Sequence, residues 1–293
     1  MRRAAAALFL GCVLFRADYS LAADEPASTA DESRVNDVRS QLRALNWIHG
    51  PKHVELFDNS ALDIPAGYMF LNPADTAKLE TITHNIGGGN QYFLCPEDFH
   101  WEAFLSFRDD GYVKDDEQID AAALLDSIKQ GTEAANKERR DRGWDEMAVT
   151  GWQTPPHYDT ETKHLEWAIA GKDMKSGADV VNFNTRILGR SGVMSVVLVA
   201  DPDSLSGSIA EVKSALAGFN YLPGQRYAEY KPGDKIAKYG LAALITGGAA
   251  AIAVKTGFWK VALGAIVAGW KFILAGFAAL VAGLRKRFKR NSA

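Results

Sequence analysis

Residues 180–200 read VVNFNTRILGRSGVMSVVLVA, and this stretch decides the fold. Apolar and polar side chains alternate through its first half, whereas its second half is almost entirely apolar. Alternation with a period of two is typical of a β-strand, and the short segment 189–191 between the halves has the composition of a turn. The stretch therefore predicts two antiparallel strands, over residues 180–188 and 192–200.

Strand-like alternation continues upstream of this hairpin. Residues 147–152 and 163–170 predict two further strands, so that the segments form an antiparallel meander with one apolar and one polar face. The proline-containing segment 155–159 is predicted to connect these two strands. Downstream, apolar side chains recur at helical spacing over residues 203–217, which predicts a helix that covers the apolar face of the meander.

The part of the chain before the meander predicts both helices and strands. Helical periodicity indicates helices over residues 34–47, 73–83 and 117–140. Short alternating segments indicate strands over residues 52–57, 67–70, 91–94 and 101–107. The predicted fold class is therefore α+β, an antiparallel sheet with flanking helices, in a domain of residues 34–233.

The N-terminus has the pattern of a secretory signal peptide. Two arginines precede a short apolar run, and small residues follow at Ser20 and Ala22. We therefore expect residues 1–23 to be removed on export. The next residues, 24–33, are polar and are predicted to form a disordered lead-in to the domain.

The number and spacing of the cysteines limit which disulfides and metal sites the exported part can form. Cys12 leaves with the signal peptide, so that Cys95 stands alone and an internal disulfide framework is excluded. No cysteine and histidine cluster has the spacing of a structural zinc site. We therefore expect neither a metal nor a cofactor.

An apolar segment near the C-terminus predicts a membrane anchor. Residues 239–254 contain no charged side chain and are flanked by lysines, which predicts a transmembrane helix over residues 239–256. Residues 257–284 form a second helical pattern, either an amphipathic helix on the membrane surface or a second membrane helix, and residues 285–293 form a basic tail. Contact with membrane lipid is thus expected through residues 239–290.

The distribution of basic residues predicts how the anchor is oriented. Because lysines and arginines follow the first apolar segment, the C-terminus is expected in the cytoplasm, which favours a single span. A two-helix hairpin is the alternative, and it would leave the basic tail outside. Gly269, Gly276 and Gly283 recur at seven-residue steps, a pattern that fits homo-oligomer packing or the general abundance of glycine in membrane helices.

The predicted exported part is strongly acidic. Residues 24–233 carry 20 basic and 34 acidic side chains, a net charge of −14. Nucleic-acid binding requires clustered lysines and arginines, so that this class of partner is excluded. We expect a protein of the inner, cytoplasmic membrane whose main domain faces the periplasm or the exterior.

Several short motifs together give the chain a family resemblance. They are DGYV at 110–113, GW at 151–152, PPHYD at 155–159, NFNTRILGR at 182–190, DKI at 234–236 and GLAA at 240–243. With these motifs the chain resembles a bacterial family of uncharacterised membrane-anchored proteins, the domain-of-unknown-function family 2167. The resemblance covers most of residues 45–250. It implies a signal peptide, an exported domain and a C-terminal anchor, and it brings no established activity.

Seven polar side chains form the candidate site. They come from the segment 155–159 and from the strand 180–188 with its following turn: His157, Tyr158, Asp159, Asn182, Asn184, Arg186 and Arg190. An enzyme would use His157 as a base, Asp159 to orient it and Arg186 to stabilise an oxyanion. No nucleophile motif accompanies them, so that no catalytic residue is assigned. Alternate polar positions on one strand instead favour a face that binds a carboxylate, a peptide or sugar hydroxyls.

Two functions from different classes follow. The first is a membrane-anchored extracytoplasmic binding or regulatory protein whose acidic domain contacts a protein partner or an envelope ligand. The alternative is a membrane-anchored hydrolase that acts on a cell-envelope or carbohydrate substrate, and the sequence favours the non-catalytic protein. Geometry separates the two, because a hydrolase needs His157 and Arg186 to meet at one cleft.

Overall fold

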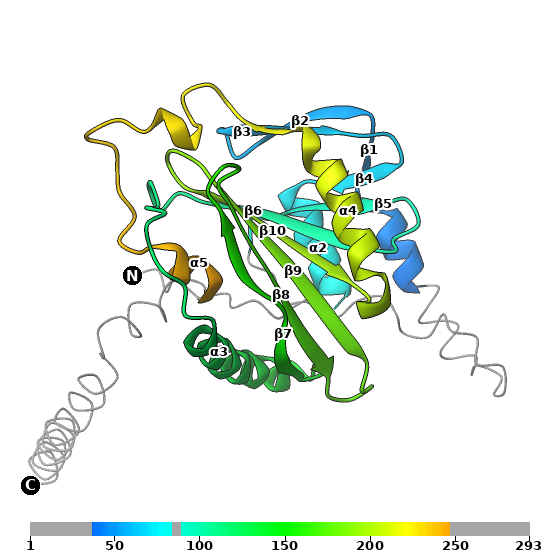
Figure 1. Ribbon diagram of the computed structural model, residues 1–293. Helices are drawn as coiled ribbons and strands as arrows, with labels where there is room; N and C mark the ends of the chain where they lie inside the picture. Colours follow the sequence, from blue (N-terminus) through cyan, green and yellow to red (C-terminus); the bar gives the residue numbers. More distant parts are fainter. Residues whose placement is uncertain (1–36, 84–88, 247–293) are drawn as a thin grey trace, which may run out of the picture.

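The computed structural model describes residues 37–83 and 89–246 as a layered α+β fold (Figure 1). A large antiparallel sheet forms the central layer. A smaller sheet and one helix pack on one face of it, and further helices pack on the other face. The predicted class, an antiparallel sheet with flanking helices, is confirmed.

The large sheet has eight strands, and every neighbouring pair is antiparallel. In spatial order the strands are β1 (Ile48–His49), β4 (Tyr68–Leu71), β5 (Tyr92–Pro96), β6 (Glu102–Arg108), β10 (Val193–Ala200), β9 (Asp179–Leu188), β8 (His164–Asp173) and β7 (Met147–Asp159). The hairpin predicted from residues 180–200 is β9 and β10, and it lies in the middle of the sheet. The decisive stretch of the sequence therefore occupies the centre of the fold.

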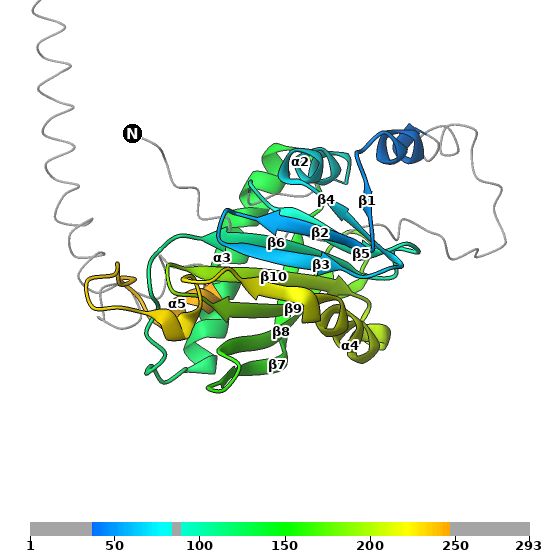
Figure 2. The ribbon, with the colours of Figure 1, turned by 90° about the horizontal axis from the view of Figure 1, so that it is seen from above.

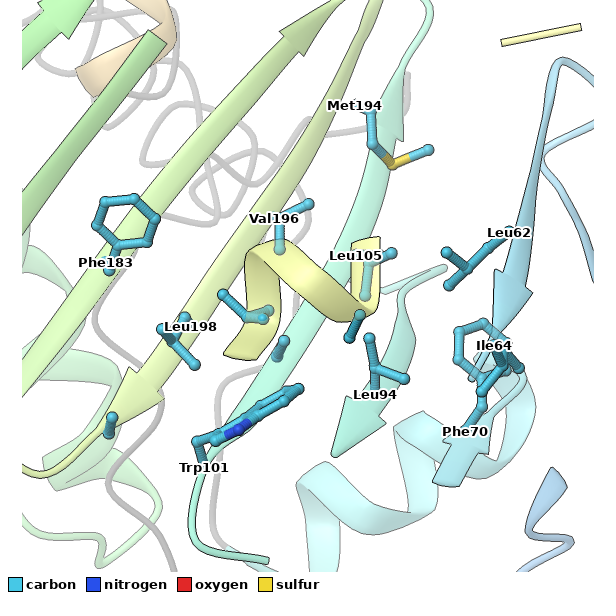
Figure 3. Close-up of a cluster of buried hydrophobic side chains, with 14 of the residues drawn as sticks. Leu62, Ile64, Phe70, Leu94, Trp101, Leu105, Phe183, Met194, Val196 and Leu198 are labelled. Atoms are coloured by element: carbon cyan, nitrogen blue, oxygen red, sulfur yellow. The ribbon is translucent and has the colours of Figure 1, made fainter. Parts of the chain in front are cut away.

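One face of the large sheet, which we call the sandwich face, is covered by a second sheet and by α4. The small sheet has the order β11 (Phe219–Tyr221), β3 (Ser60–Ile64) and β2 (Lys52–Leu56), and α4 spans Leu205–Ala215. Figure 2 looks onto this side, with α3 passing behind the large sheet. Leu62, Leu105 and Leu198 belong to one hydrophobic cluster between the layers and are fully buried (Figure 3).

The opposite face, which we call the helical face, is covered by three helices. They are α2 (Pro73–Ile82), α3 (Ala121–Asp141) and α5 (Leu241–Thr246). α3 packs mainly on β7, whereas α2 packs on β4 and β5. Leu124 of α3 and Leu244 of α5 join Trp167 of β8 in one buried cluster, and Leu79 of α2 joins Phe93 of β5 in another.

Local capping explains where the longer helices begin. The side chain of Asn72 accepts a hydrogen bond from the backbone N–H of Asp75 at 3.0 Å, and proline follows as the first residue of α2. Asp120 accepts two backbone N–H groups at 3.1 Å at the start of α3. The helix predicted from residue 117 therefore begins at Ala121, because Asp120 is the residue that caps it.

Several connecting elements complete the described chain. A short helix covers residues 37–43, inside the helix predicted over residues 34–47. Three 3₁₀ turns occur as η1 (Pro202–Ser204), η2 (Leu216–Gly218) and η3 (Tyr227–Glu229). The first two adjoin α4 directly, so that the helix predicted over residues 203–217 is present and has a 3₁₀ turn at each end.

The predicted end of the first meander strand is wrong. β7 does not stop at residue 152 but continues through both prolines to Asp159, and its pairing with β8 shifts at three places. β7 is the outermost strand of the sheet, so that its outer edge needs no N–H donor to a neighbour. Prolines are tolerated at such an edge and at bulges, which explains why the strand continues.

The prediction of one apolar and one polar face is also wrong. Leu165 of β8 lies opposite Arg186 of β9, and Trp167 lies opposite Asn184, so that apolar and polar side chains share the helical face. Phe183 and Ala168 share the sandwich face beneath α4. Both faces are buried, because helices cover the one and the small sheet with α4 covers the other.

The described chain ends at α5. No helix within residues 37–83 and 89–246 is long and apolar enough to cross a membrane. The predicted signal peptide, lead-in and basic tail, the glycine seam and the segment 257–284 lie outside the described residues, as do residues 247–256 of the predicted span. The first part of that span, Leu241–Thr246, forms α5 and is buried against α3.

Candidate functional site

Five side chains that carry polar atoms lie on the helical face near the centre of the sheet. We call them the inner polar cluster: Trp167 on β8, Asn182, Asn184 and Arg186 on β9, and Glu102 on β6. Trp167 lies directly across from Asn184, and Val199 of β10 pairs with Asn182 on one side and Glu102 on the other. None of the five residues is more than 7 % exposed.

Alternation along β9 places the three polar residues of that strand together. Positions 182, 184 and 186 point to one side of the strand, and positions 181, 183 and 185 point to the other. The side-chain N–H₂ of Asn184 donates to the backbone carbonyl of Asn182 at 3.2 Å. The guanidinium of Arg186 donates to the carbonyl of Thr185 at 3.1 Å and lies 4.6 Å from the ring centre of Trp167.

Four buried polar atoms of this cluster have no hydrogen-bond partner among the described residues. They are Oδ1 of Asn182, Oδ1 of Asn184, Nε1 of Trp167 and Oε2 of Glu102. Buried polar atoms are nearly always paired, because each one left without a partner costs about 1–3 kcal/mol. Such atoms gathered on one sheet face are therefore a reason to consider a ligand.

Burial also changes the acid–base properties of the cluster. It raises the pKa of Glu102 to about 8, so that this carboxyl is mostly protonated at neutral pH. Burial, with a further contribution from the charge of Arg108, lowers the pKa of Arg186 to about 9. Arg108 forms an ion pair with Asp110 at 2.7 Å, and Asp110 also accepts the hydroxyl of Tyr239.

The structure separates His157 from Arg186. His157 lies opposite Glu166, which in turn lies opposite Thr185, so that the three side chains point to the sandwich side of the sheet. Arg186, one position further along β9, points to the helical side. His157 is exposed, whereas Arg186 is buried. A base and an oxyanion-stabilising cation therefore do not meet at one place.

Tyr158 lies on the helical side but belongs to a separate polar group. Its hydroxyl donates to Asp115 at 2.8 Å, and Lys163 contacts the same carboxylate oxygen at 2.9 Å. Partial burial and the hydrogen bond to Asp115 raise the pKa of Tyr158. The ammonium of Lys163 lies 5.3 Å from the ring centre of Tyr227. These contacts fasten the segment before α3 to the ends of β7 and β8.

Asp159 and Arg190 hold local structure. Asp159 accepts the backbone N–H groups of Glu161 and Thr162 at 2.8 and 3.1 Å, which closes the turn between β7 and β8. Arg190 makes two hydrogen bonds of 2.7 Å to the carboxylate of Asp234 and a third to the carbonyl of Gly224. Of the seven predicted site residues, the structure thus gathers Asn182, Asn184 and Arg186.

Sequence reasoning did not include Glu102 and Trp167 in the site. Glu102 begins β6 and is followed by three apolar residues, and an acid at an inward position of such a strand is a signal that could have been used. The proximity of Trp167 to Asn184 depends on the register of β8 and β9. That register is a long-range property that single-strand periodicity does not contain.

The described residues give no metal centre. Within residues 37–83 and 89–246, no group of three or more histidine, cysteine, aspartate or glutamate side chains is arranged to hold a metal ion. Asp115, which precedes α3, is engaged by Tyr158 and Lys163.

Comparisons with solved structures give low similarity. The cyanobacterial PsbP (CyanoP) from Synechocystis sp. PCC 6803 matches with a TM-score of 0.36 and 6 % identity, over 58 % of this chain and 92 % of its own. LpqN of Mycobacterium tuberculosis, described as involved in cell envelope biogenesis, matches with a TM-score of 0.22 and 16 % identity, over 62 % of this chain and 95 % of its own.

Comparison with protein families gives a match over most of the chain. No curated protein matches the sequence. The family described as "Protein of unknown function (DUF2167)" matches residues 48–281, which include every strand and helix bounded above except the short helix at residues 37–43. The chain therefore belongs to the DUF2167 family.

Proposed function

We propose that this chain is a membrane-anchored extracytoplasmic binding or regulatory protein, and that the inner polar cluster is its binding element. One observation carries the proposal: four buried polar atoms of the cluster have no hydrogen-bond partner among the described residues. A ligand that supplied the missing partners would recover part of the cost of burying them. Binding would then be favoured by the arrangement of the side chains themselves.

The alternative, a hydrolase, has less support from the geometry. His157 and Arg186 point to opposite sides of the sheet, and Asp159 is engaged by the backbone of its own turn. A hydrolytic site needs a base, a nucleophile and an oxyanion donor within reach of one substrate atom. We therefore propose the binding function alone.

Crosslinking from two faces of the sheet tests the binding function. Ser106 of β6 is half-buried and points to the helical face, in register with Ser195 and Arg186. A photoreactive benzoylphenylalanine in place of Ser106 should capture the partner in cells. The same group in place of His157, on the opposite side, should not capture it.

A second variant controls for chance encounters. Asn184→Leu removes an unpartnered oxygen of the cluster at similar side-chain volume, and it should abolish capture from position 106 while the protein stays folded by circular dichroism. If capture from position 106 is unchanged in Asn184→Leu, or is equal from position 157, the cluster is not the binding element.

The location of the domain rests on the two ends of the sequence. The basic and apolar N-terminus supports export, and the basic C-terminus supports an anchor whose tail stays inside. Protease added to spheroplasts should digest the acidic domain and spare an epitope tag placed after Ala293. Digestion of the tag with survival of the domain would reverse the orientation and remove the extracytoplasmic assignment.

A further inference from the structure

We propose that residues 221–240, which we call the exit segment, dock the domain on a bilayer surface that carries anionic phospholipid headgroups. The inference rests on the membrane anchor of the proposed function and goes beyond it, because the contact is made by the folded domain itself. It is carried by the way in which the exit segment is held, by the side chains that it exposes, and by the opposite charge of the rest of the domain.

The exit segment, drawn in yellow to orange in Figure 1, is fixed along one end of the domain. The ring of Tyr112 packs on the rings of Tyr227 and Tyr230, with ring centres 4.4 and 4.3 Å away. Tyr112 also donates its backbone N–H to the carbonyl of Lys235 at 2.7 Å, and its own carbonyl accepts the N–H of Ala237 at 2.9 Å. The surface of the exit segment is therefore formed before any lipid binds.

The last part of the exit segment presents an apolar and a basic side chain together. Ala237 and Tyr239 pack against the buried cluster beneath α3 and α5. Ile236 and Lys238, at the alternate positions of this extended stretch, therefore point to solvent. Ile236 is 44 % exposed, which is unusual for a large apolar side chain among the described residues. An apolar side chain beside an ammonium group suits the boundary between headgroups and acyl chains.

Basic side chains dominate the exposed surface of the exit segment. Its four basic residues are all exposed: Arg226, Lys231, Lys235 and Lys238. Its two acidic residues are engaged by the protein, because the carboxylate of Asp234 pairs with Arg190 at 2.7 Å and that of Glu229 accepts two backbone N–H groups at 2.9 Å. The charge that remains for a partner is therefore positive.

Two of these lysines are available to meet headgroups. Within residues 37–83 and 89–246, no ion pair engages the ammonium group of Lys231 or of Lys238. Lys235 donates to the carbonyl of Asp109 at 2.6 Å and lies 4.0 Å from its carboxylate, so that its charge is partly balanced. Near an anionic bilayer each available lysine strengthens binding by roughly fivefold.

The rest of the domain is repelled by the same surface. Residues 24–220 carry 18 basic and 33 acidic side chains, a net charge of −15. A protein of this charge avoids an anionic bilayer unless a basic part of its surface faces the lipid. The exit segment is such a part, so that the charges of the chain select one end of the domain for the contact.

The position of the exit segment in the chain favours lipid over a free protein partner. The described chain ends at Thr246, eight residues after Lys238, and the proposed anchor follows. An anchor so close in the chain holds the lysines near the bilayer at a high effective concentration, so that individually weak contacts suffice. A protein arriving from solution lacks this advantage.

Fluorescence quenching of the full-length protein in lipid nanodiscs tests the contact. The fluorophore is attached by Pro232→Cys, at an exposed position of the exit segment, in a Cys12→Ser background in which the native Cys95 is buried. Doxyl-labelled lipid quenches fluorophores that touch the bilayer. With phosphatidylcholine and phosphatidylglycerol at about two to one, the ratio of docked to undocked protein should be roughly tenfold higher than with phosphatidylcholine alone. High salt should remove the difference.

The same fluorophore at the other end of the sheet is the positional control. Met174, which is 59 % exposed, follows the end of β8 that pairs with the start of β9, whereas the exit segment joins the turn after β9. The ten residues of β9 separate the two positions by about 30 Å. A label at Met174→Cys should not be quenched in either lipid. Equal quenching at positions 174 and 232 would overturn the proposal, because no end of the domain would then be preferred.

A pair of charge variants tests the lysines themselves. Lys231→Gln combined with Lys238→Gln should lower the ratio of docked to undocked protein by roughly tenfold in the anionic nanodiscs. Lys52→Gln combined with Lys129→Gln removes the same charge from exposed positions of β2 and α3 and should leave the ratio unchanged. An unchanged ratio in the exit-segment variant would overturn the proposal.

Failure of this contact is distinguishable from failure of the binding function. Equal quenching at position 232 in both lipids would overturn the contact, while capture from position 106 would still support the binding function. Loss of that capture with lipid-dependent quenching would remove the binding function and support the contact. A chain that does not enter nanodiscs at all would overturn both the anchor and the contact.

Discussion

At the scale of single residues, a charged contact joins the turn before β6 to α4. His100 places Nδ1 2.5 Å from Asp98 and Nε2 2.8 Å from Glu211, and Trp101 donates to the same oxygen of Glu211 at 2.9 Å. Only a protonated imidazole can donate from both nitrogens. Partial burial opposes the charge, but the two hydrogen bonds outweigh it and raise the pKa of His100.

This contact predicts a pH-dependent contribution to stability. Because the pKa of His100 is higher in the folded than in the unfolded protein, its contribution is fully present below about pH 6.5 and is lost as the pH rises through the folded value. The three side chains are between 38 % and 71 % exposed, so that screening keeps the contribution below about 1 kcal/mol.

Melting curves between pH 5.5 and 8.5 measure the effect. Relative to His100→Asn, the wild-type protein should lose about 1–4 °C of its stability advantage across this range. Glu211→Gln, which keeps the shape and removes one charge, should give an intermediate slope. Parallel curves for wild type and His100→Asn would contradict the assigned role.

At the scale of elements, the side chain of Asn136 on α3 makes two hydrogen bonds to the backbone of β7. Asn136 donates to the carbonyl of Met147 at 2.8 Å and accepts its backbone N–H at 2.9 Å, and Asn136 is 3 % exposed. Asn136→Leu leaves two buried backbone groups without partners and should lower the free energy of unfolding by about 2–4 kcal/mol. Urea unfolding measures this, with Asn220→Leu as an exposed control that should change it by less than about 0.5 kcal/mol.

Another element-level contact depends on a glycine. Gly111 has a φ of +100°, and a side-chain carbon added there would lie 2.5 Å from the carbonyl oxygen of Lys235. Tyr112 donates to that same carbonyl at 2.7 Å, which ties the segment before α5 to the domain. Gly111→Ala should therefore cost about 1–3 kcal/mol. Limited proteolysis should reveal earlier cleavage near residues 231–238 than in the wild type, and an unchanged pattern would argue against this tie.

The elements themselves were largely predictable, whereas their pairing was not. Periodicity within each segment located β9, β10, α2 and α3 to within a few residues. The strand β3 was missed, and so were the very short β1 and β11. Whether these segments form strands depends on pairing with strands far away in the sequence, which local periodicity cannot reveal.

The candidate site was predictable to a similar extent. Alternation along one strand correctly grouped Asn182, Asn184 and Arg186. It could not indicate that helices cover these side chains, or that Trp167 and Glu102 lie beside them. Those facts follow from the order of strands in the sheet, which places β8, β10 and β6 next to or near β9.

At the scale of the whole molecule, both sheet faces are used to bury apolar side chains. A large-to-small change between the layers should therefore be costly: Leu198→Ala, at a fully buried position of β10, should lower the free energy of unfolding by about 2–5 kcal/mol. Denaturant unfolding with an unchanged slope would attribute the loss to the native packing. A loss below about 1 kcal/mol would indicate that the two layers pack loosely.

The position of the short helix α5 limits how many residues of the predicted span 239–256 are left to cross a membrane. Its six residues are committed to the interior of the domain, so a crossing that starts after Thr246 has ten positions left before residue 257, about 15 Å of helix against a hydrocarbon thickness of about 30 Å. For a chain anchored as proposed, we therefore expect the crossing to lie within residues 257–284. A cysteine introduced as Ala250→Cys should react from outside intact cells with a charged maleimide, since the native Cys95 is buried. Reaction only after the membrane is broken would return the crossing to residues 239–256.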